Sequence, residues 1–278
     1  MAHLLLMEGN PKKVREKAAA ISVRAASEVY GQSISAHFPD IDLTVVNAAD
    51  PDAEIPGGLS LSDFDGMVIS GSSLRAFDND PGVTRQIDLL KAFCETGKPV
   101  LGSCWGLQIA AIAAGGEVAP SPKGREIGFA RKVTLNEAGR AHPYFKGRHH
   151  SFDAPCIHYD EVSRLPAGAT LLCGNRHSEV QGAVIPIGKS EVWAVQYHPE
   201  FDVEQLSMLF RLYKEDLVSQ GFFHTEDEAE TFKGLLDKLV ENPEAKAAAW
   251  QLGIDADILH DEMRRAEIIN WVEHCILR

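Results

Sequence analysis

The stretch Lys98–Gln108 reads KPVLGSCWGLQ. Two apolar residues lead into Gly102, Cys104 follows two positions later, and Gly106 completes the pattern Gly-x-Cys-x-Gly. This spacing is the thiol counterpart of the Gly-x-Ser-x-Gly turn, in which small residues let a strained backbone lift one side chain above the edge of a sheet. We therefore expect a strand, a sharp turn and a helix here, with Cys104 placed as a nucleophile.

A nucleophilic thiol needs a base, because a cysteine beside glycines is otherwise a small core residue. The run VWAVQY at 192–197 is typical of a strand, and His198-Pro-Glu200 follows it, where the proline ends the strand. Residues two apart in an extended chain point to one face, so the imidazole of His198 and the carboxylate of Glu200 are expected to pair. The helix after Cys104 directs the positive end of its dipole to the same place, which favours a thiolate.

Three motifs together resemble one known family. They are GSCWGLQ at 102–108, HYDEV at 158–162 and QYHPE at 196–200, in the order and at about the spacing of the class I (triad) glutamine amidotransferases. Within that family the chain resembles the amidotransferase domain of GMP synthase. The resemblance implies a triad of Cys104, His198 and Glu200 that hydrolyses the side-chain amide of glutamine through a γ-glutamyl thioester, with no metal and no cofactor.

The loop Ser70-Gly71-Ser72 follows another expected strand and should lie at the same sheet edge as Cys104. An oxyanion hole needs two backbone N–H donors, one from the residue after the nucleophile and one from a neighbouring loop where glycine permits close approach. We expect Trp105 to supply the first donor and Gly71 or Ser72 the second. The resemblance implies the same loop, although this chain has Gly-Ser-Ser where many members have Gly-Gly-Pro.

Four further residues are expected near the substrate. The resemblance implies that the segment around His158 and Asp160 lines the glutamine pocket, and that Gln108 and Gln181 occupy positions similar to substrate contacts. The pair His149-His150 is not a metal-site pattern, because adjacent side chains in an extended chain point to opposite faces and no third ligand follows at metal spacing. We expect that pair to be exposed on a loop.

Short apolar runs alternate with helical patterns along the first half of the chain. Strands are expected at 3–7, 41–46 and 64–70, and one helix is expected over 14–36. Such alternation predicts an α/β fold with a mainly parallel, doubly wound sheet, and the resemblance implies its flavodoxin-like form. From residue 127 onward, short strands between turn residues predict antiparallel additions. The amidotransferase domain is expected to cover residues 1–220.

Residues 221–278 are predicted to form a helical C-terminal extension, which the resemblance does not cover. Thr225 begins a capping-box pattern, Asn242-Pro243 is predicted to open a further helix that Gly253 ends, and a last helix is expected from about residue 255. The extension is rich in large apolar side chains (Phe222, Phe223, Phe232, Leu235, Leu236 and Trp250). We interpret it as packed on the core, and the alternative is a docking surface or a homodimer contact.

The composition argues against several classes of protein. A net charge of −13 disfavours a nucleic-acid partner, since binding to phosphates normally needs a basic surface. No run approaches the roughly 18 apolar residues of a membrane span and no signal-peptide pattern opens the chain, so we expect a cytoplasmic protein without membrane contact. The five cysteines are scattered, which argues against a disulfide framework and a zinc site.

Three functions remain open from the sequence. The first, which the resemblance favours and which we take as the main hypothesis, is a glutaminase that binds glutamine and supplies ammonia to a synthetase on a separate chain. The second is a free-standing hydrolase of γ-glutamyl amides or peptides, which would use the same triad on a larger leaving amine. The third is a regulatory or binding module without catalysis, and the intact Cys104, His198 and Glu200 argue against it.

Overall fold

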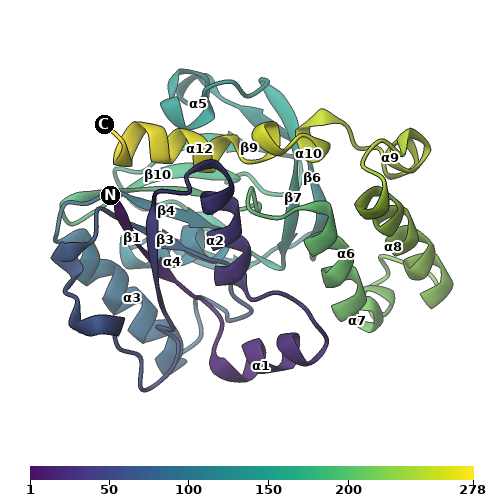
Figure 1. The fold of residues 1–278 in the computed structure, drawn as a ribbon. Helices are drawn as coiled ribbons and strands as arrows, with labels where there is room; N and C mark the ends of the chain where they lie inside the picture. The colour runs from purple at the N-terminus through teal and green to yellow at the C-terminus, as the bar shows by residue number, and fades with distance from the viewer.

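A nine-stranded sheet forms the centre of the computed structural model, which describes residues 1–278 (Figure 1). The strand order is β2-β1-β3-β4-β11-β10-β9-β6-β7. The strands are β1 (His3–Met7), β2 (Asp42–Val46), β3 (Gly66–Ile69), β4 (Val100–Ser103), β6 (Glu126–Leu135), β7 (Ser151–His158), β9 (Thr170–Gly174), β10 (Gly182–Ile187) and β11 (Ser190–Val195). A separate two-stranded sheet pairs β5 (Glu117–Pro120) with β8 (Asp160–Arg164).

Helices follow the strands and also make up most of the C-terminal region. They are α1 (Lys12–Ala20), α2 (Ala26–His37), α3 (Pro81–Cys94), α4 (Trp105–Ala113), α5 (Glu137–Ala141), α6 (Val203–Leu212), α7 (Lys214–Ser219), α8 (Glu226–Glu241), α9 (Lys246–Leu252), α10 (Ala256–Leu259), α11 (Asp261–Arg264), α12 (Ala266–Trp271) and a π-helical turn, Val272–Ile276. None of them combines the length and the apolar character that crossing a bilayer requires.

The parallel half of the sheet is covered on both faces. Strands β2, β1, β3, β4 and β11 run parallel to one another, which confirms the predicted doubly wound arrangement. Leu5 of β1 packs in one core with residues of α3 and α4, whereas Leu4 and Leu6 pack in another core with residues of α2 and α12. A strand buried on both faces needs apolar residues throughout, which explains the unbroken run in β1. Strands β10, β9, β6 and β7 extend the sheet in antiparallel order, as predicted.

The helix expected over 14–36 is in fact two helices, so that prediction is wrong. Arg24, between α1 and α2, pairs with Asp202 at 2.7 Å, and the backbone N–H of Ser27, in the first turn of α2, donates to the carboxylate of Glu8 at 2.8 Å. These contacts join the chain to β1 and to the start of α6, and they draw it out of the helical path. Apolar residues keep their helical spacing through the break, so the local sequence pattern does not indicate that the helix is interrupted.

The C-terminal extension begins as the sequence predicts and then departs from it. Thr225 caps α8 by accepting the N–H of Glu228 at 3.2 Å. Asn242 does not open a helix: it ends α8, its side-chain oxygen accepts the N–H of Glu244, and α9 starts only at residue 246. The predicted helix from residue 255 is divided into α10, α11 and α12.

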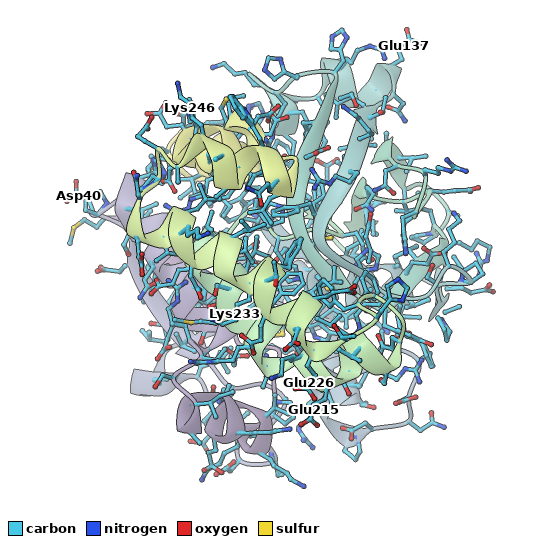
Figure 2. All side chains as sticks on the ribbon, turned by 90° about the vertical axis from the view of Figure 1, so that its right-hand side faces the viewer. Asp40, Glu137, Glu215, Glu226, Lys233 and Lys246 are labelled. Carbon is cyan, nitrogen blue, oxygen red and sulfur yellow. The ribbon has the colours of Figure 1, made fainter.

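Only some of the large apolar side chains of the extension are buried. Leu236 of α8 is fully buried against α6, but Trp250 is 77% exposed, so the expectation that it packs inside is wrong. Figure 2 looks onto α8 and shows Glu226 and Lys233 along this helix, facing the viewer. One face of α8 therefore meets the core while charged residues cover the other.

The last helix belongs to the main core. Helix α12 contacts α2 on the same side of the sheet (Figure 1), and Ile268, Trp271 and Val272 are fully buried there. The buried carboxylate of Glu267 pairs with Arg148 at 3.0 Å. The extension thus contributes side chains to the same hydrophobic core as β1.

Candidate active site

Cys104 lies in a strained turn between β4 and α4. Its φ is 50° and its ψ is −93°, which residues other than glycine rarely adopt. A Cβ on Gly102 would lie 2.9 Å from the backbone of Gly106, so the turn closes only because Gly102 has no side chain. The N–H of Cys104 donates to the carbonyl of Val195 at 2.7 Å, which joins the turn to the end of β11.

His198 and Glu200 form a hydrogen-bonded pair just beyond β11. His198 Nδ1 lies 2.6 Å from Glu200 Oε1, and the two side chains are 3% and 1% exposed. Ser103 Oγ donates to the same carboxylate oxygen at 3.0 Å. The segment is a turn and not an extended chain, so the expected pairing is present although the backbone geometry assumed for it is not.

The imidazole of His198 is held in its charged form. Burial lowers the pKa of His198, but the Glu200 carboxylate and the Cys104 sulfur outweigh that effect and raise the pKa to about 10. The ring stacks on Phe201 with centroids 3.9 Å apart, and its Nε2 is buried without a hydrogen-bond partner. This nitrogen is therefore available to exchange a proton with a neighbouring thiol or a departing amine.

Backbone N–H donors gather beside Cys104. Those of Gly71 and Ser72 form no hydrogen bond within the chain, and Trp105 begins α4, where the first N–H groups have no partner in the helix. Gly71 packs directly against the imidazole, because a Cβ there would lie 2.8 Å from His198 Cε1. The structure thus brings the loop after β3 and the start of α4 to one sheet edge.

Replacing Gly71 by alanine should lower kcat while the protein stays folded. The new methyl group would lie 2.8 Å from His198 Cε1 and would displace the imidazole from its present position. A displacement of about 1 Å in a catalytic group costs about 100-fold in rate. Steady-state kinetics and thermal melting measure both effects. Gly234→Ala is the control, since a Cβ there meets nothing within 4 Å. A Gly71→Ala enzyme with kcat close to wild type would contradict the assignment of His198 as a catalytic residue.

A cavity of about 640 Å³ opens beside Cys104 and His198. Gln108, His158 and Asp160 are among the residues that line it. Gln181 is not among them, and its expected contact with substrate stays a prediction. Gln181 is fully buried, and its side-chain amide donates a hydrogen bond to the buried carboxylate of Glu126 at 2.8 Å.

The cavity extends well beyond the turn that carries Cys104. Apolar residues of α1, of the segment after it and of α6 form part of its wall (Val14, Ala18, Val23, Leu209 and Leu212), and four arginines also line it (Arg15, Arg24, Arg75 and Arg125). Helix α1 has no buried residue. Its apolar face therefore borders this cavity instead of the core.

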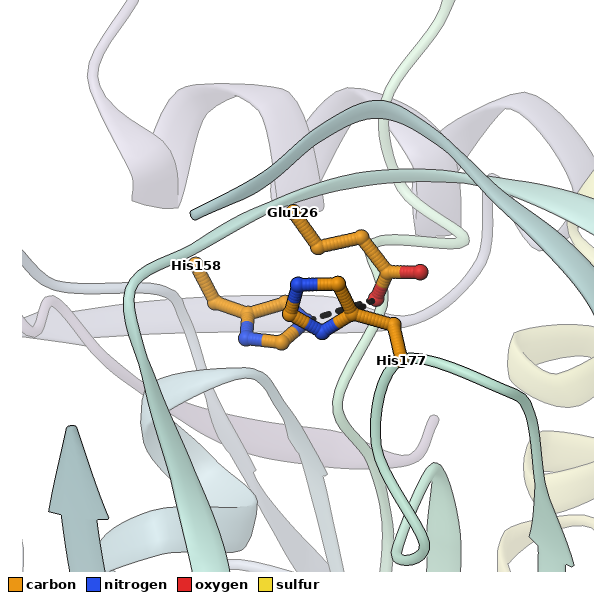
Figure 3. Close-up of side chains that lie close together, drawn as sticks. All are labelled: Glu126, His158 and His177. Atoms are coloured by element: carbon orange, nitrogen blue, oxygen red, sulfur yellow. Dashed lines mark hydrogen bonds and ion pairs between the residues drawn. The ribbon is translucent and has the colours of Figure 1, made fainter. Parts of the chain in front are cut away.

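Glu126, His158 and His177 lie beside the cavity with their ligand atoms within 4.8 Å of one another (Figure 3). Residues of these types can hold a metal ion. His158 Nε2 is 2.8 Å from Glu126 Oε2, however, and its Nδ1 is 3.1 Å from the carbonyl of Asp160, so both ring nitrogens already have partners. Burial alone would raise the pKa of Glu126, but the hydrogen bond and charge of His158 lower it. The hydrogen bond between His158 and Glu126 fixes His158 at the cavity wall.

His149 and His150, by contrast, are exposed, as expected from the sequence.

Cys104 should react with an electrophile before the other four cysteines. Burial raises the pKa of Cys94 to about 12 and of Cys275 to about 11, and it raises the pKa of Cys156 and Cys173 well above the ordinary value. Only the thiolate reacts. Limiting iodoacetamide at neutral pH, followed by peptide mass mapping, should find the label at Cys104. Equal labelling of Cys275, the least buried of the four, would argue against it.

Two residues that hold the site in place, Ser103 and Gln86, are not predicted by the sequence motifs. Ser103 orients Glu200 through its hydrogen bond. Its position directly before Cys104 could have indicated a role at the site. Gln86 on α3 accepts a hydrogen bond from the indole Nε1 of Trp105 at 2.8 Å and so supports the first residue of α4. Nothing in the local sequence marks Gln86, because that contact joins two different helices.

Comparison with known proteins identifies relatives over most of the chain. Residues 30–215 match the family model Glutamine amidotransferase class-I. The gamma-glutamyl-L-1-hydroxyisopropylamide hydrolase of a Pseudomonas species is 31% identical over 280 residues, which covers 99% of this chain and 93% of that protein. Gamma-glutamyl peptidase 4 of Arabidopsis thaliana is 34% identical over 202 residues, covering 72% of this chain and 75% of that protein.

The fold also has a solved counterpart. The crystal structure of a glutamine amidotransferase from Thermotoga maritima superposes with a TM-score of 0.63 at 18% identity, covering 86% of this chain and 94% of that chain. At this identity the likeness shows the fold alone.

Proposed function

This chain belongs to the class I glutamine amidotransferase family, and from that premise we propose that it is a free-standing hydrolase of γ-glutamyl amides. The size of the cavity carries the proposal: about 640 Å³ opens beside Cys104, with apolar walls from α1 and α6. Ammonia as a leaving group needs almost no space, whereas a cavity of this size suits a ligand larger than glutamine. The proposal is the second of the three functions that the sequence left open.

Cys104 is the proposed nucleophile. Its thiolate attacks the γ-carbonyl carbon, and the carbonyl oxygen becomes an oxyanion that accepts hydrogen bonds from the N–H of Trp105 and from Gly71 or Ser72. Donors already placed where the charge develops stabilise the transition state more than the bound substrate. The strained turn serves this step, because it holds sulfur and the first donor on adjacent residues.

His198 is the proposed acid and base. Its Nε2 protonates the departing amine as the C–N bond breaks, and the γ-glutamyl group stays on sulfur as a thioester. The same nitrogen then takes a proton from water, which attacks the thioester and releases glutamate. Glu200, supported by Ser103, accepts the hydrogen bond from Nδ1 and stabilises the imidazolium.

The leaving amine is assigned to the apolar part of the cavity, and the γ-glutamyl group to the part near Gln108, His158 and Asp160. Gln108 Nε2 donates to the carbonyl of Asp160 at 2.9 Å, so this wall is rigid. The Pseudomonas relative supports a short amine, since its name specifies a hydroxyisopropylamide. Its match also runs through the C-terminal extension and is not limited to the residues around the triad.

Glutamate release from γ-glutamyl-L-1-hydroxyisopropylamide, γ-glutamylethylamide and glutamine tests the proposal. We expect kcat/KM to be at least about 10-fold higher for the two amides than for glutamine, because one buried methylene is worth roughly 10-fold or more. A preference for glutamine, together with faster turnover when a co-purified synthetase is added, would instead support a glutaminase that supplies ammonia to a separate chain.

A further inference from the structure

Arg125 is the one arginine of the cavity without an acidic partner. The other three form the ion pairs Arg15–Asp50 (2.7 Å), Arg24–Asp202 (2.7 Å) and Arg75–Asp160 (3.1 Å). The Nε of Arg125 is buried and has no hydrogen-bond partner. The chain has 40 acidic and 27 basic residues, yet none of its carboxylates forms an ion pair with this guanidinium. A bound anion would neutralise the charge of Arg125 in the cavity.

Tyr213 fixes the orientation of this guanidinium. Arg125 Cζ lies 5.1 Å from the centre of the Tyr213 ring, and both residues line the cavity that contains Cys104. Stacking occupies the flat face of a guanidinium and leaves its N–H donors, which lie in the plane, directed elsewhere. Those paired donors match the two oxygens of a carboxylate.

The backbone beside Arg125 is equally well fixed. Its neighbour Glu126 is buried, and the Glu126 carboxylate accepts hydrogen bonds from His158, Asn175 and Gln181 at 2.7–2.8 Å. Figure 3 shows the His158 part of this cluster. Because Glu126 starts β6, the arginine before it is held in place before any ligand arrives, which lowers the entropy cost of binding.

We infer that Arg125 binds a carboxylate of the substrate and thereby selects the substrates of this enzyme. The inference rests on the proposed function. A guanidinium without an anionic partner is costly in a cavity, and a carboxylate that pairs with its terminal N–H groups removes this cost on binding. Two carboxylates have this chemistry: the α-carboxylate of the γ-glutamyl group, and the carboxylate of an amino acid that leaves from a γ-glutamyl peptide.

Three substrates separate these two sources in the Arg125→Gln enzyme. γ-Glutamylglycine has both carboxylates, γ-glutamylethylamide has only the α-carboxylate, and 4-aminobutanoyl ethylamide has neither. We expect KM to rise roughly 10- to 100-fold wherever the recognised carboxylate is present, with much smaller changes in kcat, since the lost contact is made equally in the bound substrate and the transition state. A rise for both glutamyl substrates assigns the α-carboxylate. A rise for γ-glutamylglycine alone assigns the leaving amino acid.

Arg176→Gln is the matched control, because Arg176 is exposed and does not line the cavity; its KM values should equal those of the wild type. Unchanged KM values for both glutamyl substrates in Arg125→Gln would overturn the inference and leave the proposed function intact. If the wild type hydrolyses none of the three, the proposed function fails. Calorimetry of γ-glutamylglycine with Cys104→Ala and with Cys104→Ala/Arg125→Gln then still decides the role of Arg125, since equal affinities would overturn it.

Discussion

Glutamate release from a γ-glutamyl amide by the Cys104→Ala variant should fall by at least about 10⁴-fold. Without sulfur no thioester forms, and water would have to attack the amide directly in the proposed oxyanion hole. Loss of a single triad member in comparable enzymes costs about 10⁴- to 10⁶-fold in kcat. The measurement is enzyme-coupled detection of glutamate at saturating substrate. Thermal melting should show a folded protein, because alanine is smaller than cysteine and leaves the turn between β4 and α4 unobstructed.

Cys275→Ala is the control for this experiment. Cys275 is half-buried near the end of the chain and does not line the cavity, so its removal should leave kcat within about twofold of wild type. Release by Cys104→Ala above about 1% of the wild-type rate would show that another group is the nucleophile.

Replacing Glu267 by alanine should lower the free energy of unfolding by roughly 3–5 kcal/mol, because it leaves Arg148 charged and unpaired in the core. The side chains of Arg148 and Glu267 are 1% and 0% exposed. Glu267 also accepts a hydrogen bond from the hydroxyl of Tyr197, just before His198, at 2.6 Å. Total stability of a domain is about 5–15 kcal/mol, so the loss should be obvious in urea unfolding.

Two further variants show whether the charge is the cause. Glu273→Ala changes an exposed residue on the same segment and should shift stability by less than about 0.5 kcal/mol. Arg148→Met combined with Glu267→Leu removes both charges and should recover much of the loss, since an apolar pair of similar volume replaces a buried ion pair well. A mild effect of Glu267→Ala would contradict our proposal that the extension, through α12, is part of the main core and not a separable unit.

The candidate site could be located from the sequence because its residues stand at the ends of strands. Gly71 follows β3, Cys104 follows β4 and His198 follows β11, and parallel strands bring their carboxyl ends to one edge. Strand ends are marked by short-range signals, such as glycine and proline after an apolar run. Such signals do not show which distant side chains meet, and for that reason the helix break before α2 and the burial of Gln181 were not foreseen.

The candidate nucleophile, its histidine and carboxylate partners and the class of sheet could be predicted from the amino-acid sequence, because each is marked by a short local pattern. The folded chain was needed to show the size of the cavity, the packing of α12 on the sheet and the lack of an ion-pair partner for Arg125. Those features depend on contacts between segments that lie far apart in the chain, such as Arg125 with Tyr213 or Arg148 with Glu267. Local periodicity shows which face of an element is apolar, but the folded chain decides what that face meets.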